Sequence, residues 1–534
     1  MQLVTRADMR AIEAAADAGG HSFADMMYRA GQAVAEAAED LLDGAPAIVV
    51  ALIGPGSNGG DGLVASLALA DAGHIIRALV WHRDPADGLL AEAAANGAIE
   101  LLRAEEDEAM ETLAGWLAEA DLVLDALLGT GADRPIDGDL AEILDLLGDA
   151  VDAEPGGPTL LAVDLPTGLD PDTGALDPHT VAADVTVTFG FPKLGHFTMP
   201  GAEAVGELQI DEIGISAELG RLAQLLPPLE PDAHKGSQGT VLAWAGSANC
   251  PGAAGLAAEA AYRGGCGLVR IALPEGLQLG LTAWIPEAVY LPLPAGPEAP
   301  DTVHRAVASL TEGLGDAEAV LLGPGIGRGG GQGQVFAEVL RAWSRLPREL
   351  PPALVLDADA LYHLAQRPEL AKQLPPGTIL TPHPGEMAGL CGKTVEQVQA
   401  ARLDEARALA ERLQAVVVLK GALTVVALPD GRATISPVVE PALATAGTGD
   451  VLSGLIAGLL AQGLPSEDAA LLGVWLQGRA GEMAAESFGP RSVLARDVLD
   501  ALPDAILELE EGGPDLGDWL NEAMGMGDDD EAWD

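Results

Sequence analysis

Lysine is nearly absent from this chain of 534 residues, and positive charge as a whole is scarce. Lys+Arg number 28 against 81 Asp+Glu, which gives a formal net charge of −53 at pH 7. A charge of this sign and size repels phosphodiester backbones and anionic head groups, so it argues against nucleic acid and membrane partners. The five lysines are Lys193, Lys235, Lys372, Lys393 and Lys420.

The acidic composition also predicts a surface adapted to high salt. At about 1 M ionic strength, charges are screened within roughly 3 Å, which removes most of the self-repulsion of an anionic protein. We therefore expect a halophile-like acidic surface. An acidic protein that needs no salt is the alternative.

Cysteine and long apolar runs are scarce as well. Cys250, Cys266 and Cys391 show no CxxC spacing, so neither a disulfide framework nor a cysteine zinc site is indicated. No run reaches the about 18 apolar residues that a membrane span needs, and the N-terminus carries Arg6, Asp8 and Arg10 in place of an apolar signal core. We expect a soluble, cytoplasmic protein.

The length of the chain predicts two large domains, because single cores stop growing at about 250–300 residues. Aromatics make up only 3% of the chain, so the cores must be built from Ala, Leu, Val and Ile. The proline-rich stretch 225–231 is a linker signal. We predict α/β domains over residues 1–220 and 221–505, followed by an acidic tail over 506–534.

The first half alternates helices and buried strands. Helical spacing over residues 5–42, broken at Gly19-Gly20, predicts two helices before a strand at 47–53. A glycine-dense loop over 54–62 and a helix over 63–72 follow, a layout that presents backbone amides to a phosphate. Further strands are expected at 75–81, 122–127, 160–164 and 185–189.

Oxygen-bearing side chains follow three of these predicted strands. Asn58, Asp125 and Thr167 lie just beyond strand ends, where open α/β sheets bind ligands. Hard oxygens converging from three strand ends suit a cation. Taken singly, each residue is more often a cap or turn residue, and only their joint placement favours a cation site.

The second half repeats the pattern after the linker. Strands are predicted at 240–245, 266–271, 319–322, 353–356, 378–380 and 415–419, with a helix over 252–263. His383 follows one strand between two prolines, which suits either substrate contact or a structural role. Lys420 follows another and is expected to contact phosphate. Asp357 and Asp359 either cap a helix or approach the nucleotide.

The stretch Ala446-Gly447-Thr448-Gly449-Asp450 runs into an apolar segment that predicts a buried helix. A helix N-terminus offers unpaired amides and partial positive charge, and glycine lets a phosphate approach them closely. Asp450 beside such a site suits a general base that takes a proton from a hydroxyl during phosphoryl transfer. The alternative is an ordinary N-cap aspartate.

The segments SNGGDG, DALLGTG, VDLPTGLD and FGFPKLGH resemble the NAD(P)H-hydrate epimerase domain over about residues 1–215. The resemblance implies a Rossmann-like fold that binds hydrated dinucleotide and a potassium ion. Asn58, Asp125 and Thr167 then match the K+ ligands, and Asp164, with Lys193 nearby, is the candidate acid/base. Matching substrate contacts are Ser57, Asn58, Gly59, Gly60, Asp61, Gly129, Thr130 and Gly131, the last group extending to Pro135, together with Asp164.

The segments HKGSQG, LGPGIG, LDADAL, TPHPGE, VLKG and AGTGDVLSG resemble, in this order, the ADP/ATP-dependent NAD(P)H-hydrate dehydratases over about residues 228–505. The resemblance implies a ribokinase-like fold and ADP or ATP with Mg²⁺. Cys250 stands where that family often has an aromatic residue. Ala253, Gly325, His383 and Asp450 match hydrate contacts. The matching nucleotide site comprises Lys420, Gly421, Ala422, Leu423, Thr424, Gly447, Thr448 and Gly449.

Together the resemblances imply two three-layer α/β domains, Rossmann-like and ribokinase-like, in one metabolite-repair enzyme. The first domain would interconvert the C6 epimers of NADHX and NADPHX, and the second would dehydrate one epimer. A ribokinase-like kinase acting on a vitamin precursor is the first alternative, and a dinucleotide-responsive binding protein without turnover is the second. We also expect a homo-oligomer.

Overall fold

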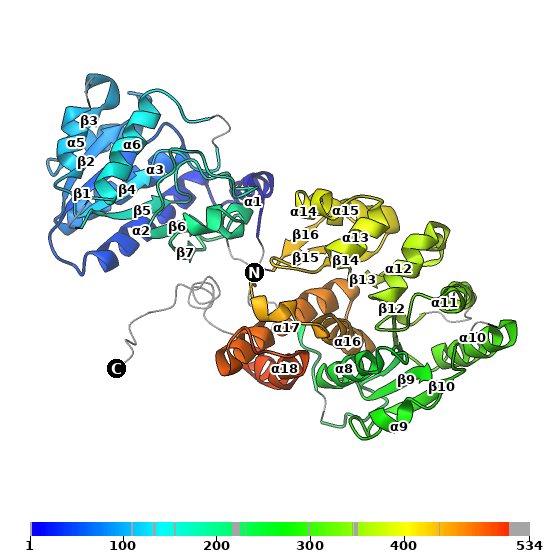
Figure 1. Cartoon of the computed structure of the whole chain (residues 1–534). Coiled ribbons are helices and arrows are strands. Elements are labelled where there is room, and N and C mark those ends of the chain that lie inside the picture. Colours follow the sequence, from blue (N-terminus) through cyan, green and yellow to red (C-terminus); the bar gives the residue numbers. More distant parts are fainter. Residues whose placement is uncertain are drawn as a thin grey trace. The chain divides into compact units, whose positions relative to one another are not determined.

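A computed structural model describes residues 3–107, 110–131, 135–153, 156–215, 225–229, 231–296, 299–343, 345, 351–436 and 438–511. The chain divides into two compact units, whose described parts are residues 3–215 and 225–511 (Figure 1). The predicted linker stretch 225–231 is described except for residue 230, whereas most of the predicted acidic tail lies outside the described residues. No described helix is long and apolar enough to cross a bilayer.

The N-terminal unit is built on one parallel sheet with strand order β3-β2-β1-β4-β5-β6-β7. This is the Rossmann order, in which the direction of winding reverses between β1 and β4. The strands are β1 Ile48–Ile53, β2 Ile75–Val80, β3 Ile99–Arg103, β4 Leu122–Ala126, β5 Thr159–Val163, β6 Val185–Phe189 and β7 Glu207–Asp211. The helices are α1 Arg6–Ala18, α2 Phe23–Leu41, α3 Ser57–Ala72, α4 Gly88–Ala95, α5 Glu111–Leu117 and α6 Asp139–Val151, with 3-10 turns at η1 Ala104–Glu106, η2 Leu194–Phe197 and η3 Gly201–Glu203.

Two separate cores make this unit three-layered. One face of the sheet packs on α1 to α4, through residues such as Val34 and Leu63. The other face packs on α5 and α6, through residues such as Leu113 and Ile143. Because both faces are covered, the central strands β1, β4 and β5 are mostly apolar, whereas the outer strands β3 and β7 also carry charged side chains.

The glycine-dense segment after β1 is helical where a loop was expected. Helix α3 begins at Ser57, six residues earlier than predicted, and its N-cap is Gly56. Asn58 to Gly62 are buried. The glycines there allow close packing: a Cβ on Gly59 would lie 2.1 Å from the carbonyl oxygen of Gly54, and one on Gly60 would lie 2.7 Å from Sδ of Met27.

The C-terminal unit contains a mixed sheet with strand order β10-β9-β8-β11-β12-β13-β14-β15-β16, in which β15 alone runs against the other strands and so pairs antiparallel with β14 and β16. Its strands are β8 Thr240–Trp244, β9 Leu268–Pro274, β10 Val289–Leu293, β11 Ala319–Leu322, β12 Ala353–Leu356, β13 Ile379–Leu380, β14 Val416–Leu419, β15 Val425–Ala427 and β16 Ala433–Ile435. Its helices are α8 Pro251–Arg263, α9 Gln278–Leu281, α10 Pro300–Leu314, α11 Gly330–Trp343, α12 Asp359–Gln366, α13 Pro384–Cys391, α14 Val395–Gln399, α15 Arg402–Leu413, α16 Thr448–Ala461, α17 Ser466–Phe488 and α18 Ala495–Glu510, with η5 Pro368–Gln373 and η6 Pro441–Ala444.

This unit is also three-layered. Helices α8, α16, α17 and α18 share one core with the sheet, and α10, α11 and α12 share the other. The predicted helix after Gly447 is α16, and nearly all of it is buried. Its glycines let α8 approach closely, since a Cβ on Gly454 or Gly458 would lie 2.1 or 2.3 Å from a carbonyl oxygen of α8. Both fold predictions, Rossmann-like and ribokinase-like three-layer domains, are confirmed.

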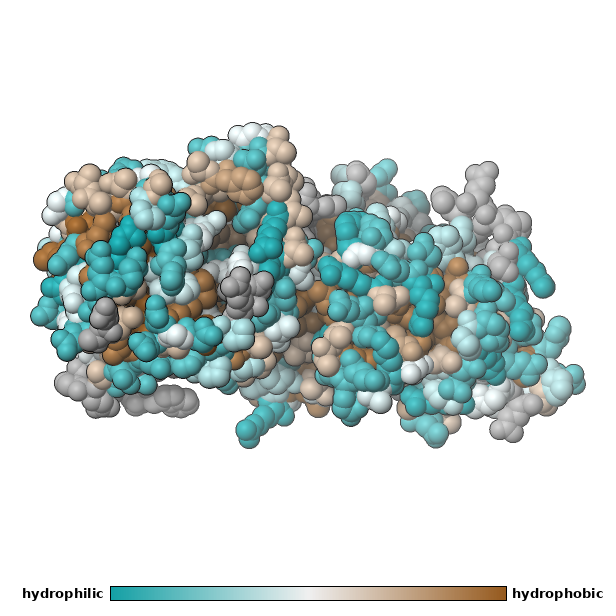
Figure 2. Space-filling view, turned by 90° about the horizontal axis from the view of Figure 1, so that it is seen from above, coloured by the Kyte–Doolittle hydropathy of each residue, from teal (hydrophilic) through white to brown (hydrophobic). Residues whose placement is uncertain are grey.

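The space-filling view shows how hydrophilic and apolar residues are distributed over one face of the molecule (Figure 2). On the face seen in Figure 2, hydrophilic residues cover much of the described surface, with apolar residues showing between them. The apolar side chains are otherwise concentrated in the buried clusters of the two units.

Candidate active sites at the carboxyl edges of the two sheets

A cavity of about 400 Å³ opens at the carboxyl edge of the N-terminal sheet, where β1 and β4 diverge. This is where open α/β sheets bind ligands. Most predicted contacts of this unit line it together: Ser57, Asn58, Asp61, Gly129, Thr130, Gly131, Asp164 and Lys193. Gly59 and Gly60 instead face Gly54, Arg83 and Met27. Pro135 is described, whereas residues 132–134 lie outside the described residues.

Two of the three predicted cation ligands are joined directly. The Asp125 carboxylate accepts hydrogen bonds from the hydroxyl and the amide of Thr167, each at 2.7 Å. Asp125 is buried, and burial raises its pKa while the bonds from Thr167 and Leu127 lower it. The groups that donate these hydrogen bonds are all neutral, so none of them neutralises the negative charge of the Asp125 carboxylate.

The third predicted ligand, Asn58, is buried with both polar side-chain atoms lacking a hydrogen-bond partner. Buried side-chain amides normally make hydrogen bonds, so a buried amide whose oxygen and nitrogen both lack a partner points to a role in binding a ligand. The side chain lies against Gly129, where a Cβ would come within 3.1 Å of Cγ of Asn58. An unpaired amide oxygen, a hydroxyl and a carboxylate suit an alkali cation.

Asp164 and Lys193 form a buried ion pair, with Nζ of Lys193 2.5 Å from Oδ1 of Asp164. Burial raises the pKa of Asp164, but the ammonium of Lys193 and its hydrogen bond outweigh it, so the carboxyl stays ionised. Thr188 also donates to this carboxylate, at 3.0 Å. Asp164 has a left-handed backbone (φ 67°), a conformation that is costly for a residue with a Cβ.

His196 fixes the backbone of this pair. Its Nδ1 accepts the amide of Lys193 at 3.1 Å, so its Nε2 carries the proton and donates to the carbonyl of Asp164 at 2.9 Å. Burial lowers the pKa of His196 to about 3, with Lys193 adding to the effect, so the ring remains neutral. His196 ends the FGFPKLGH segment, but no local pattern predicts its role, because that role depends on Asp164 in a separate loop.

A second cavity, of about 260 Å³, lies in the C-terminal unit between the β14–β15 turn and the start of α16. Lys420, Gly421, Ala422, Thr424, Thr448 and Gly449 line it, as predicted for a nucleotide site. Leu423 and Gly447 do not: Leu423 adopts φ 56° in the turn, and Gly447 packs on Leu256 and Ala495 with φ 99°.

Arg402 holds the 419–423 turn from behind, a role not predicted from the sequence. Its guanidinium donates to the carbonyl of Leu419 at 3.1 Å and to those of Lys420 and Leu423 at 3.4 Å. Similarly, Arg83 donates to the carbonyls of Gly54 and Gly56, both at 2.9 Å, below the N-terminus of α3. Each arginine rigidifies a glycine-containing turn that lines a cavity.

Asp450 is the third residue of α16, and the N-cap of that helix is Gly447. The N-cap alternative for Asp450 is therefore wrong. Burial, reinforced by the neighbouring Asp357, raises the pKa of Asp450 to about 7, while Lys420 opposes the shift. A carboxyl that titrates near neutrality at a helix N-terminus is suited to general-base catalysis.

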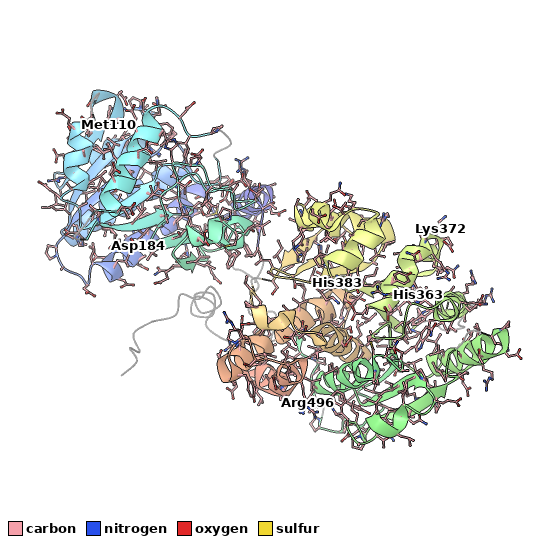
Figure 3. The ribbon with its side chains drawn as sticks, viewed as in Figure 1. Met110, Asp184, His363, Lys372, His383 and Arg496 are labelled. Atoms are coloured by element: carbon pink, nitrogen blue, oxygen red, sulfur yellow. The ribbon has the colours of Figure 1, made fainter. Side chains whose placement is uncertain are left out.

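The other predicted hydrate contacts lie along the same sheet edge. Gly325 contacts α8, because a Cβ there would lie 3.0 Å from that of Ala253. His383 is the N-cap of α13 and is half exposed, with Nδ1 accepting the Gly385 amide at 3.0 Å and Nε2 3.3 Å from Glu386 (Figure 3). His363, labelled in the same view, instead donates to the carbonyl of Gly327 in the scaffold.

The sequence leaves the roles of Asp357 and Asp359 undecided. In the structure Asp357 pairs with Lys420 at 2.7 Å. Asp359 accepts hydrogen bonds from the amide of Gly327 and the guanidinium of Arg328, both at 2.8 Å. Glu386 completes this acidic group, and burial raises its pKa. Among the described residues, no three His, Cys, Asp or Glu side chains are arranged to hold a metal ion by themselves.

Comparisons with known proteins agree with both halves. Residues 241–504 match the NAD(P)H-hydrate dehydratase family, and residues 23–195 match the family described as YjeF-related protein N-terminus. The bifunctional NAD(P)H-hydrate repair enzyme Nnr of Thermofilum pendens is 38% identical over 504 residues, covering 91% of this chain and 92% of that protein. The enzyme of the same name from Moorella thermoacetica is 38% identical over 507 residues, covering 91% and 93%.

Among solved structures, the ADP/ATP-dependent NAD(P)H-hydrate dehydratase from Bacillus subtilis, co-crystallized with ATP/Mg²⁺, is 32% identical. It covers 54% of this chain and 96% of its own, with a TM-score of 0.45. The two full-length relatives align across both units of this chain. The chain therefore belongs to the family of bifunctional NAD(P)H-hydrate repair enzymes.

Proposed function

We infer that the chain repairs hydrated NADH and NADPH through an epimerase in the N-terminal unit and an ADP- or ATP-dependent dehydratase in the C-terminal unit. The observation that carries this inference is that each unit has its own cavity at the carboxyl edge of its own sheet, in a chain of the bifunctional family. A small-molecule kinase would leave the first cavity unexplained. We propose the domain boundary near residue 220.

In the dehydratase, Asp450 acts as the general base. It takes the proton of the C6 hydroxyl of NAD(P)HX as that oxygen attacks the terminal phosphoryl group of the nucleotide, and AMP or ADP leaves. The amides at the start of α16, including that of Gly449, hold the transferred group. Ala253, Gly325 and His383 contact the hydrate on the adjoining edge.

The phosphorylated intermediate then loses phosphate. The lone pair of N1 forms an N1–C6 double bond as the C6–O bond breaks, and loss of a C5 proton restores the dihydronicotinamide ring. Lys420, Gly421, Ala422, Thr424, Thr448 and Gly449 form the nucleotide site, and Leu423 and Gly447 shape the two turns that carry it. Mg²⁺ fits beside it, since the carboxylates of Asp357 and Glu386 offer hard oxygens there and the ion would neutralise phosphate charge.

In the epimerase, Asp164 is the base and Lys193 keeps it ionised. Ser57, Asp61, Gly129, Thr130 and Gly131, which line the cavity, contact the hydrated dinucleotide, whereas Gly59 and Gly60 shape the start of α3 beside it. Asn58, Asp125 and Thr167 would hold K+, whose positive charge would favour an anionic ligand in this acidic protein. The side-chain amide of Asn58, which has no hydrogen-bond partner, and the carboxylate of Asp125, whose hydrogen-bond donors are all neutral, support this assignment.

The deciding experiment incubates NADHX with the protein and ADP or ATP and follows recovery of the absorbance of the reduced ring. Full recovery from a mixture of epimers is expected, because the epimerase feeds the stereospecific dehydratase. If absorbance does not recover with either ADP or ATP, the kinase alternative is favoured. An Asp164→Asn variant should retain dehydration of one epimer and lose recovery of the other. Unchanged recovery of both would remove Asp164 from the mechanism.

We further propose a cytoplasmic homo-oligomer that uses neither nucleic acid nor membrane. The net charge of −53 supports the exclusion of anionic partners. Light scattering after size-exclusion chromatography measures the assembly, and a monomer would contradict it.

A further inference from the structure

Besides Asp61 and Asp164, the epimerase cavity contains a third carboxyl group, which neither the predicted motifs nor the family match accounts for. Glu13 lies on α1 and lines the same cavity as Asp164 and Lys193. The family match begins only at residue 23, so α1 lies outside it. An epimerase must run in both directions, which calls for two groups that can exchange protons with the substrate.

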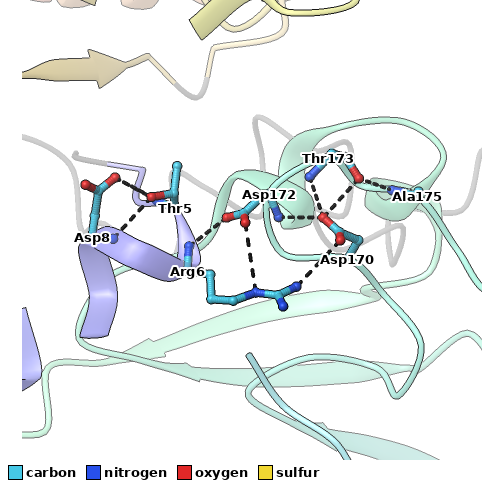
Figure 4. A network of polar contacts seen from close by, with 7 residues as sticks. All are labelled: Thr5, Arg6, Asp8, Asp170, Asp172, Thr173 and Ala175. Atoms are coloured by element: carbon cyan, nitrogen blue, oxygen red, sulfur yellow. Dashed lines mark hydrogen bonds and ion pairs between the residues drawn. The ribbon is translucent and has the colours of Figure 1, made fainter. Parts of the chain in front are cut away.

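Helix α1 is held firmly beside the catalytic loops. Arg6 donates its amide to Asp172 at 2.6 Å and pairs with Asp170 at 3.5 Å, both in the loop that follows β5 and Asp164 (Figure 4). Thr5 and Asp8 form a reciprocal capping box at the start of the helix. These contacts fix α1 against the loop that continues from Asp164.

The segment before α1 is fixed to the loop of Lys193 as well. The amide of Val4 donates to the carbonyl of Pro192 at 3.1 Å, and its carbonyl accepts the amide of Leu194 at 3.2 Å. The first residues of the chain thus bracket Lys193. A helix tied to both catalytic loops holds a side chain with the accuracy that proton transfer requires.

We propose that Glu13 is the acid that works with the base Asp164 in epimerisation, an inference that rests on the proposed epimerase function. Asp164 takes the proton of the C6 hydroxyl, the C6–O bond becomes a carbonyl and the N1–C6 bond breaks. Glu13 gives its proton to N1. After rotation about C5–C6, Glu13 takes back the N1 proton as N1 attacks the other face of the carbonyl. Asp164 then returns its proton to the oxygen, and both carboxyls are reset.

The charges around Glu13 favour the protonation state that this role needs. Burial raises the pKa of Glu13 and Asp164 raises it further, while Lys193 and Arg10 lower it. Asp61, on α3, is the other acid that interacts with Glu13. Asp164 is held ionised by Lys193. Burial also raises the pKa of Asp61, so both Asp61 and Glu13 differ from the ionised Asp164. Opposite pKa shifts of two carboxyls in one cavity, here those of Glu13 and Asp164, are a usual arrangement for an acid and a base.

The test compares Glu13→Gln with Asp17→Asn in the full-length protein. Asp17 is an exposed acid on the same helix, so the control removes the same charge away from the cavity. Glu13→Gln should lower the kcat of epimerisation by about 10²-fold or more. It should also abolish the fall in rate at alkaline pH that marks loss of an acid. Asp17→Asn should keep both the rate and the pH profile.

The dehydratase rate on the reactive epimer, measured in the same samples, reports folding independently. A Glu13→Gln protein with wild-type epimerisation and an unchanged pH profile would overturn the proposal. Wild-type protein that dehydrates but never epimerises would instead overturn the epimerase function. With ¹⁸O at C6, the label should be retained through successive inversions. Exchange with water in step with inversion would rule out Glu13 as the acid at N1.

Discussion

The ammonium of Lys420 lies 2.7 Å from Oδ1 of Asp357, although the two residues are 63 positions apart in the chain. A Cβ on Gly449 would lie 3.1 Å from the same Nζ. This single contact therefore ties the ends of β12 and β14 to the N-terminus of α16. It also places a cation where the proposed phosphoryl transfer occurs, beside the proposed base Asp450.

Replacing Lys420 by methionine should weaken nucleotide binding and reduce stability. The carboxylate of Asp357 would lose its buried partner, which lowers the free energy of unfolding by about 3 kcal/mol. ADP affinity measured by isothermal titration calorimetry should fall. Lys372→Met, at an exposed lysine of the same unit, is the matched control and should bind ADP normally. Equal ADP affinity in the two variants would contradict a phosphate contact by Lys420.

Asp450→Asn should abolish dehydration while epimerisation continues, because the two sites lie in separate units. Loss of a general base lowers kcat by about 10²–10⁴-fold. Asp301→Asn, at an exposed acid in the first turn of α10, should leave both activities unchanged. Substantial dehydration by Asp450→Asn would assign the base to another residue.

The dehydratase rate should rise with pH and level off above neutrality. The pKa of Asp450 is raised to about 7, so the carboxyl is protonated and inactive as a base below that value. A pH series of kcat in the wild-type protein should show a midpoint near 7. A rate that is flat from pH 5 to 9 would mean that Asp450 is not the base.

The same shift predicts that Asp450 destabilises the folded protein at alkaline pH. Its folded pKa is about 7 and that of an unfolded aspartate is near 3.8, so this group lowers stability progressively as pH rises from 3.8 to 7, and the loss is complete above 7. Asp450→Asn should therefore melt higher than wild type at pH 8. The excess should vanish toward pH 4. At 1.36 kcal/mol per pKa unit the effect is at most about 4 kcal/mol, and partial exposure reduces it. A lower melting temperature at pH 8 would contradict this sign.

Epimerisation should depend on K+ at constant ionic strength. Replacing KCl by tetramethylammonium chloride should lower the epimerase rate and leave the nucleotide site's ADP affinity unchanged. Asn58→Leu fills the same space without the amide oxygen, so the variant should be slow in both salts. If wild-type rates are equal in the two salts, the triad of Asn58, Asp125 and Thr167 is not an activating cation site.

The acidic surface should make thermal stability salt-dependent. With a net charge of −53, the many acidic side chains repel one another at low ionic strength, and salt screens that repulsion. The melting temperature should rise steeply between about 0.1 and 1 M NaCl, beyond the small change usual for a neutral protein. A flat response would support the merely acidic alternative.

Much of the fold could be predicted because buried parallel strands are short apolar runs that end at Gly, Asp or Thr. The predictions for β6, β11 and β12 agree with the structure residue by residue. The start of α3 was placed too late, because four glycines between Gly54 and Gly60 indicate a loop when their packing partners are unknown. Only Gly54, Arg83 and Met27 explain why glycines there begin a helix.

The candidate sites divide in the same way. Local sequence patterns indicate the strand ends and helix start that carry four of the site residues: Lys420, Asp450, Asp125 and Thr167. The roles of Glu13, His196 and Arg402 depend on partners that are distant in sequence, such as Asp164 for His196, so no local spacing predicts them.

The sequence by itself determined the charge, the two α/β halves and the polar residues at each strand end, since these follow from composition and local periodicity. Only the tertiary structure decided which of those ends meet. It joined Asp125 to Thr167, set Lys420 between Asp357 and α16, and brought Glu13 on α1 to the cavity of Asp164. The physical reason is that sheet order and helix docking are set by packing among distant segments, and burial in that packing then sets the pKa of each carboxyl.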